Sequence, residues 1–147
     1  MIVTKSPLLL KSFTVLNSSC HTIPFPEMEG GASFKETQDK YAIDLDFGIK
    51  KEKLSGQTLI FVKLSINPEK NPGYSIFAEG VGIFSFDATE ELSEKDKRGL
   101  IQYSAVSICV TNVRSFVANM TAYSPFGIYN FPSIDMNALL KQKSEQK

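Results

Sequence analysis

The residue types that most often carry out chemistry are scarce in this chain. His21 is the only histidine, and Cys20 and Cys109 are the only cysteines. Cys20 and His21 are neighbours in a segment with strand character, where successive side chains point to opposite faces. A thiolate–imidazole pair is therefore not expected, and the two cysteines match no metal or redox spacing. We expect no metal site and no cofactor.

Asp44 and Asp46 are the second candidates for chemistry. They lie two residues apart in a segment of alternating polarity, so both carboxylates would share one strand face, where they could hold a proton or a cation. An ordinary solvated sheet face explains the same alternation, and we favour that interpretation. The sequence also has no glycine-rich phosphate loop. We therefore do not expect an enzyme.

Two alternatives stay open at this point. One is an enzyme that uses Cys20 or the Asp44–Asp46 pair. The other is a domain that binds a small molecule in a cavity between a helix and a sheet.

Composition limits the remaining classes of function. The chain has 147 residues, with 16 basic and 16 acidic side chains, so its net charge is zero. A neutral chain lacks the electrostatic signature of a nucleic-acid or anionic-membrane binder. The apolar run near the N-terminus is too short for a secretion signal, which predicts free thiols in the cytoplasm. The length predicts a single domain over residues 1–147.

The hydrophobic pattern predicts four strands followed by two helices. The strands are expected at 12–23, 41–50, 58–66 and 73–86, and the helices at 100–122 and 134–143. Asn17-Ser18-Ser19 weakens the middle of the first strand, and 24–40, with Gly30-Gly31, is expected to be a loop. Strands grouped before helices indicate an α+β fold: a four-stranded antiparallel sheet with a long helix and a short C-terminal helix on one face.

The predicted long helix carries a single charge, Arg114, and so has no charged face for water. Its amides, arginine and hydroxyls are too polar for a membrane span, so we expect it to be covered by protein. One side packs on the sheet near Gly80 and Gly82. A stripe of small residues on the helix predicts close contact with a second subunit, although tight packing on the chain's own sheet is the alternative. The stripe consists of Ser104, Ser107, Thr111, Ser115 and Ala118.

Large apolar side chains also gather in the segment between the two helices, 123–132. Two prolines keep this segment extended, and loops normally lie at the surface. It could cover an edge of the core, or it could form a wall of an apolar groove. Such a groove would bind extended, unfolded polypeptide through apolar contacts and backbone hydrogen bonds.

Several segments, taken in order, resemble the SecB family of export chaperones. The resemblance runs from about Phe13 to Leu140 and is strongest from Gly82 onward. Its motifs are Asp44-Leu45-Asp46, Gly82-Ile83-Phe84-Ser85, and Phe126 and Asn130 followed by Ile134-Asp135-Met136-Asn137-Ala138-Leu139. In the last region Ser133, Asp135 and Met136 stand where the family has proline, asparagine and phenylalanine.

The resemblance implies an ATP-independent chaperone that holds non-native polypeptides in an apolar groove. It also implies a homotetramer with long helices sandwiched between eight-stranded sheets, and delivery of clients to the SecA motor for export. The family's interhelix loop lines part of the groove. The implied peptide-binding residues are therefore Tyr41, Ile43, Phe126, Tyr129 and Phe131.

The positions implied for SecA docking depart from the family pattern. Family members that dock on SecA present acidic side chains on the outer sheet face, whereas the matching positions here are Asn17, His21 and Phe77. SecA's docking segment is basic, so an uncharged face lacks the electrostatic partner for it. Chaperone activity is thus better supported than SecA delivery. The alternative is a SecB-like chaperone dedicated to one client, such as the antitoxin of a toxin–antitoxin pair.

Overall fold

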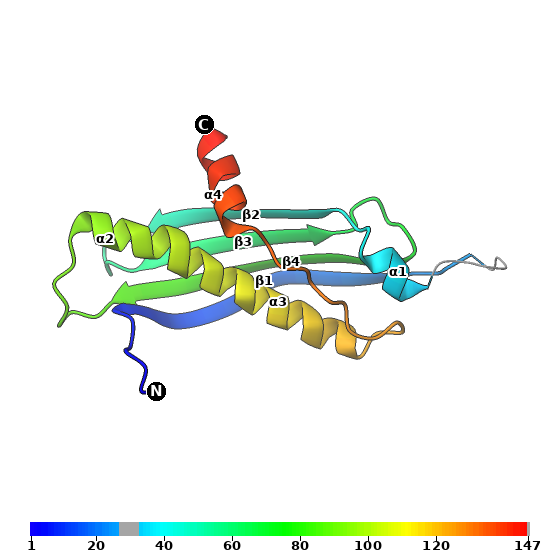
Figure 1. Cartoon of the computed structure of the whole chain (residues 1–147), viewed down its shortest axis with the longest axis horizontal. Coiled ribbons are helices and arrows are strands. Elements are labelled where there is room, and N and C mark those ends of the chain that lie inside the picture. The colour runs from blue at the N-terminus through cyan, green and yellow to red at the C-terminus, as the bar shows by residue number, and fades with distance from the viewer. Residues whose placement is uncertain (27–32, 147) are drawn as a thin grey trace.

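The computed structural model of the chain describes residues 1–26 and 33–146. A long helix crosses one face of an antiparallel sheet, and α4 (Met136–Glu145) stands across the edge of the same face (Figure 1). The predicted α+β architecture is confirmed. The sheet order is β1-β4-β3-β2, with bounds β1 Leu8–Ile23, β2 Ile43–Lys51, β3 Thr58–Ile66 and β4 Gly73–Phe86.

The core lies between the inner sheet face and the long helix. Alternation in β3 buries one set of side chains, as predicted, and β4 supplies the next row. The helix covers them with β-branched residues and one cysteine, each three or four residues from another member of the set. The central layer comprises Ile60, Val62, Leu64, Ile66, Tyr74, Ile76, Ala78 and Phe84 from the sheet, and Val106, Cys109, Val110, Val113 and Val117 from the helix.

The first strand is longer than the sequence predicted. It begins at Leu8 rather than at residue 12, because Leu8 pairs with Phe86 at the end of β4. The expected weak point at 17–19 stays in the ladder, opposite residues 77–79. The register shifts beside it, at Leu16, and this bulge absorbs the irregularity while the polar residues keep their pairing.

The long helix is one continuous rod of three parts: α2 (Glu94–Gly99), the π-helical segment η1 (Leu100–Ala105) and α3 (Val106–Ala122). It starts six residues before the predicted apolar stretch, where the Asp96 N–H donates to the Ser93 Oγ at 3.1 Å. In η1 the Val106 N–H donates to the Ile101 carbonyl, a five-residue step.

Helix α4 is displaced from the predicted range, 134–143. Asp135 caps it through a hydrogen bond from the Ala138 N–H at 3.0 Å, so the first helical residue is Met136. A further short helix, α1 (Phe34–Gln38), lies in the predicted loop 24–40 and is capped by Ser33. The loop's Gly30-Gly31 lies outside the described residues.

Gly82 allows the helix to approach the sheet closely. A Cβ at this position would come 2.5 Å from the Cys109 Sγ of α3, too close for any side chain. A Cβ at Gly80 would instead meet the Phe13 ring of β1, at 2.6 Å. The expected packing of the helix on the glycine pair is therefore confirmed for Gly82 alone. Among residues 1–26 and 33–146, no helix has the length and apolar character of a membrane span.

Candidate binding groove

The structure separates the residues considered for chemistry. Cys20 is half-buried and His21 is exposed on the neighbouring position of β1. Burial raises the pKa of the Cys20 thiol, and a hydrogen bond with the Ser124 side chain partly offsets this. The thiol is therefore less ionised than an ordinary cysteine, the opposite of an activated nucleophile. Within the described residues, no three His, Cys, Asp or Glu side chains gather as a metal site would require.

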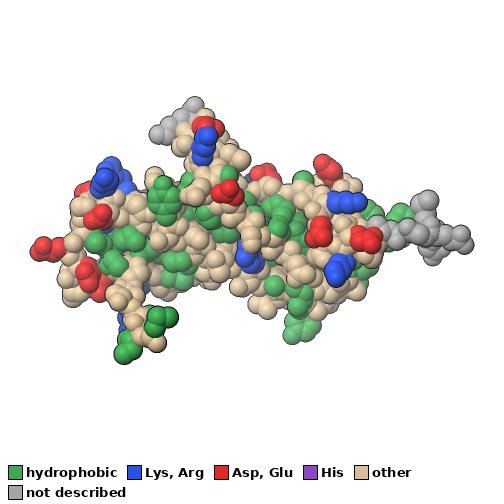
Figure 2. Space-filling view, viewed as in Figure 1, with side chains coloured by type: hydrophobic (Ala, Val, Ile, Leu, Met, Phe, Trp, Pro, Cys, Tyr) green, Lys and Arg blue, Asp and Glu red, His purple; other side chains and the backbone are tan. Residues whose placement is uncertain are grey.

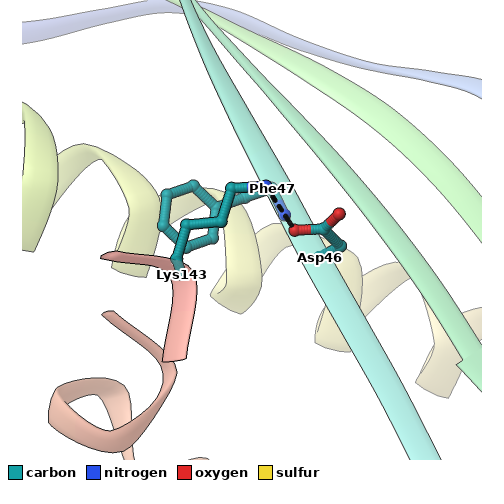
Figure 3. Close-up of polar contacts among 3 residues, drawn as sticks. All are labelled: Asp46, Phe47 and Lys143. Carbon is teal, nitrogen blue, oxygen red and sulfur yellow. Dashed lines mark hydrogen bonds and ion pairs between the residues drawn. The ribbon is translucent and has the colours of Figure 1, made fainter. Parts of the chain in front are cut away.

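The two aspartates of β2 have unequal surroundings. Asp44 is exposed, whereas Asp46 accepts a hydrogen bond from the Lys143 Nζ at 2.8 Å and another from the Phe47 N–H at 2.8 Å (Figure 3). The bond from Lys143 is the main cause that lowers the pKa of Asp46. One carboxylate of the pair thus has a structural partner, which ties α4 to β2.

The aromatic loop, residues 123–132, lies against the core at the C-terminal end of α3. The Tyr74 hydroxyl holds its first turn, accepting from the Phe126 N–H at 2.8 Å and donating to the Gly127 carbonyl at 2.9 Å. Further along, the Tyr129 N–H donates to the Thr121 Oγ1 at 2.9 Å. These bonds satisfy backbone groups that burial would otherwise leave unpaired.

Three of the five predicted peptide-binding residues form one aromatic group, and Phe126 and Ile43 are not part of it. Tyr41, Tyr129 and Phe131 are adjacent, with ring centroids 6.0 Å apart for the first pair and 6.5 Å for the second. Phe126 packs instead between Phe34 and Tyr74, and Ile43 is half-buried at the start of β2.

Tyr41 and Tyr129 are largely closed to a client. Tyr129 is 2% exposed, and its burial raises the pKa of its hydroxyl to about 12. The buried Tyr41 hydroxyl donates to the Pro72 carbonyl at 2.6 Å and accepts from the Tyr74 N–H at 3.2 Å. A client could reach these two rings only if the loop moved.

Arg114, the single charge of the predicted helix, also serves this loop. Its guanidinium donates to the Pro132 carbonyl at 2.9 Å and lies 5.3 Å from the centre of the Phe131 ring. A cation over an aromatic face is attracted by the ring's electron density. The charge therefore fastens the loop to α3, and the helix needs no charged face.

An open groove lies elsewhere, between β2, the π-helical segment and α4. It has a volume of about 740 Å³ and is lined by Phe47, Ile49, Gln102, Tyr103 and Leu140, with polar residues of α4 at its rim. Ile49 is 45% exposed and Tyr103 58% exposed. Hydrophobic side chains are open to solvent around the base of α4 (Figure 2).

The groove continues toward the start of the long helix. A second hollow of about 280 Å³ shares Ile49 and Gln102 with the first and adds Phe86 and Ile101. The five-residue hydrogen-bond step in η1 widens the helical turn that presents Ile101 and Gln102 to this hollow. Inserted π-turns occur often at functional sites. The alternating pattern of β2 placed Ile49 on the apolar face of the strand. Nothing in the sequence predicted that Ile49 would lie opposite Tyr103.

Helix α4 forms one wall of the groove and has few attachments. None of its residues is fully buried, although Leu139 and Leu140 pack against the core. The Lys143 Nζ completes the attachment, 2.8 Å from Asp46 and 5.6 Å from the centre of the Phe47 ring (Figure 3). A wall held in this way could move to admit a ligand.

The floor of the groove borders a free strand edge. β2 pairs only with β3 in the described sheet, so every second backbone N–H and C=O points outward. The Phe47 N–H is one of these outward groups, and the Asp46 carboxylate accepts from it. An extended polypeptide can pair with such an edge while its side chains enter the groove.

The predicted oligomer stripe runs along the long helix beside the groove, and the hollow next to it shares Tyr103 with the groove. Thr111 and Ser115 are exposed, and Ser104, Ser107 and Ala118 are half-buried. Ser104, Ser107 and Thr111 also line a hollow of about 530 Å³ between the helix and Leu8 of β1. None of the five side chains is fully buried in the contact between helix and sheet.

Comparison with known proteins points to the fold. The sequence matches no protein-family model and no curated protein. Among the solved structures that match is the Mycobacterium tuberculosis SecB-like chaperone Rv1957, in complex with a ChAD peptide from the Rv1956 HigA1 antitoxin. The two chains superpose with a TM-score of 0.59 over 88% of this chain and 91% of the other, at 10% sequence identity. The chain therefore has the SecB-like fold.

Proposed function

We propose that this protein is an ATP-independent chaperone that binds extended, non-native polypeptide segments. The groove along β2 carries the proposal, because it combines an apolar floor with a free strand edge. Apolar side chains of a client would pack on Ile49, Tyr103 and Leu140. Backbone hydrogen bonds to β2 would supply affinity with little dependence on sequence.

Such binding needs no chemical step. A client segment held in the groove is removed from the pool that aggregates, and release returns it unchanged. We propose that residues 1–147 act as one domain without a cofactor. Both cysteines, Cys20 and Cys109, are unpaired, which suits the reducing conditions of a cytoplasm.

Aggregation of a chemically denatured protein tests the proposal. After dilution from denaturant, light scattering should fall as this protein is added without nucleotide. Ile49→Asp combined with Tyr103→Asp should abolish suppression, because a carboxylate on an apolar floor loses solvation on client binding. Full suppression by this variant would contradict the groove as the binding site.

Two exposed apolar residues provide matched controls. Leu54→Asp, at a position 98% exposed in the turn between β2 and β3, should leave suppression unchanged. Ile128→Asp reports on the aromatic loop, where the side chain is 53% exposed. Loss of suppression by this variant would assign client contact to the loop and support the predicted set Tyr41, Ile43, Phe126, Tyr129 and Phe131.

A single dedicated client is the second candidate. The SecB-like chaperone with the similar fold was solved with an antitoxin peptide, so this architecture accommodates one specific segment. The outer sheet face supports the same choice, since Asn17 and Phe77 are uncharged and Glu79 pairs in register with Lys63. We therefore propose client binding without SecA delivery. Failure to suppress aggregation of several model proteins, together with tight binding of one cellular protein, would favour this candidate.

We also propose that the small-residue stripe forms a subunit interface, within a tetramer. Its partly exposed hydroxyls and the hollow beside β1 leave room for a second helix. Ser107→Leu or Thr111→Leu should overfill that space and lower the mass measured by light scattering after size exclusion. Thr37→Leu, on α1, is a control of the same kind. An unchanged mass in both stripe variants would overturn this interface.

A further inference from the structure

The charges around the groove are not balanced, although those of the chain are. The chain has 16 basic and 16 acidic side chains. The residues that line the two parts of the groove together include five basic side chains and one acidic side chain, Glu94. The basic residues are Lys51 of β2, Lys97 and Arg98 of α2, and Lys141 and Lys143 of α4.

Two of the five cations already have partners. Lys143 binds Asp46, as described above, and the Lys97 Nζ lies 3.7 Å from a carboxylate oxygen of Glu94. The latter pair is solvent-exposed, so it is weak and easily exchanged. Lys51, Arg98 and Lys141 make no ion pair within residues 1–26 and 33–146. These three exposed cations remain available to a ligand.

The cations border an apolar floor on two sides. Lys141 stands on the α4 wall, whereas Lys51 and Arg98 lie at the other end, beside Ile49 and Ile101. Acidic side chains such as Asp87, Glu90 and Glu91 occur on the loop before α2, but they are not among the residues that line the groove. In Figure 2 a group of Lys and Arg side chains lies at the upper-left end of the face that bears α4.

We infer that the groove selects extended client segments in which apolar side chains are flanked by Asp or Glu. This inference rests on the proposed function and names the chemistry of its client. In an extended segment successive side chains alternate, so apolar ones can enter the floor while acidic ones reach the rim. The apolar floor distinguishes such a client from a polyanion, which would leave Ile49, Phe86 and Tyr103 uncovered.

The preference should be moderate and dependent on salt. An exposed ion pair typically changes affinity by about two- to fivefold. Three cations together should therefore favour an acidic over a basic segment by about tenfold or more at low salt. Rim charges act mainly through the association rate, and salt screens them over about 10 Å at 0.1 M. The difference should shrink to about twofold at high salt.

Four labelled peptides test the inference by fluorescence anisotropy with the full chain. Three share one apolar core and differ in their flanking residues, which are Glu, Gln or Lys. The fourth keeps the Glu residues and replaces the apolar ones by Ser. We expect affinity in the order Glu, Gln, Lys, and no binding of the fourth peptide. Equal affinities for the first three peptides, or binding of the fourth as tight as the first, would overturn the inference.

A pair of variants assigns the preference to the groove. Lys51→Glu with Arg98→Glu should reverse the order of the Glu and Lys peptides while the Gln peptide binds as before. Lys35→Glu with Lys40→Glu changes the net charge equally at exposed positions near α1, and should leave the order intact. If both variants change the order of peptide affinities in the same way, the effect arises from net charge, and the inference is contradicted. If none of the three apolar peptides binds the wild type, the proposed function itself fails.

Discussion

Two apolar regions of the molecule differ in how their backbone is satisfied and in how far their side chains are exposed. The aromatic loop is closed around Tyr129, because hydroxyls of Tyr74 and Thr121 bind its backbone groups and the Tyr129 ring is buried, whereas Tyr123 stays exposed. The groove is open, because α4 approaches β2 through one ion pair and a few partly buried leucines. Aromatic composition therefore does not show by itself which apolar side chains are accessible. Accessible apolar area beside an unpaired strand edge is the better indicator of a binding surface.

Two tyrosines provide the largest expected contrast between the regions. Tyr129 is 2% exposed and Tyr103 is 58% exposed. Tyr129→Ala should lower the free energy of unfolding by about 3 kcal/mol or more, because it empties a packed site. Tyr103→Ala should change it by less than about 0.5 kcal/mol and should weaken client binding instead. Urea unfolding and peptide binding measure the two effects. Similar losses of stability in both variants would remove the distinction.

Alkaline pH should destabilise the aromatic loop and the core beneath α3. Burial raises the pKa of Tyr129 to about 12 from an ordinary 10.0, and that of Cys109 to about 12 from 9.0. Both groups are neutral in the folded protein. Their contribution to the free energy of unfolding is therefore complete below about pH 9 and is lost as the pH rises toward 12. Unfolding midpoints in urea should fall over this range. Cys109→Ala should make the decline begin about one unit higher, whereas an unchanged onset would show that Cys109 has no part in it.

The hydroxyl of Tyr74 holds the loop closed, and its removal should loosen the loop without emptying the core. Tyr74→Phe loses two hydrogen bonds to the loop backbone, at Phe126 and Gly127. We expect a loss of about 1–3 kcal/mol in the free energy of unfolding. Hydrogen exchange should rise in 124–130 and stay constant along β2. Exchange that rises equally in α4 would mean that the two regions open together.

The Lys143–Asp46 pair should have the smallest effect on stability and a larger one on the groove. Both side chains are partly exposed, so Lys143→Ala should cost less than about 1 kcal/mol. Because Lys143 lowers the pKa of Asp46, the pair stabilises the fold above the carboxyl's ordinary pKa and is lost as the pH falls through the lowered value. Hydrogen exchange in α4 should rise in the variant, and client association should become faster. Lys35→Ala, at an exposed position on α1 outside the groove, is the matched control.

Much of the architecture could be predicted, because patterns within short stretches of the sequence indicate most of its strands and helices. Strict alternation in 58–66 located the buried face of β3, and the apolar stretch 100–122 predicted the long helix. The missed elements had weaker local signals. Leu8–Leu10 became strand only because the end of β4 offered a partner, and α1 is a five-residue helix.

The predicted site was harder to judge, because exposure depends on neighbours far along the chain. Periodicity placed Ile49 on the same face as Phe47, but one is exposed and the other buried. The difference arises from where the long helix and α4 lie over the sheet, up to 97 residues away in the case of Lys143 and Asp46. Similarly, the aromatic loop was recognisable from its composition. Its closure depended on Tyr74, which is 52 residues before Phe126.

The chain's composition therefore determined its neutral charge, and its local patterns determined most of the strands and the two main helices, because these depend largely on residues near one another in the sequence. The assembled fold decided which apolar residues stay accessible and which cations share a groove. Those properties depend on the packing of α4 and the long helix against β2, which brings together residues 49, 98, 103 and 141. No periodicity within one segment encodes such a meeting, since it requires the relative placement of three elements in space.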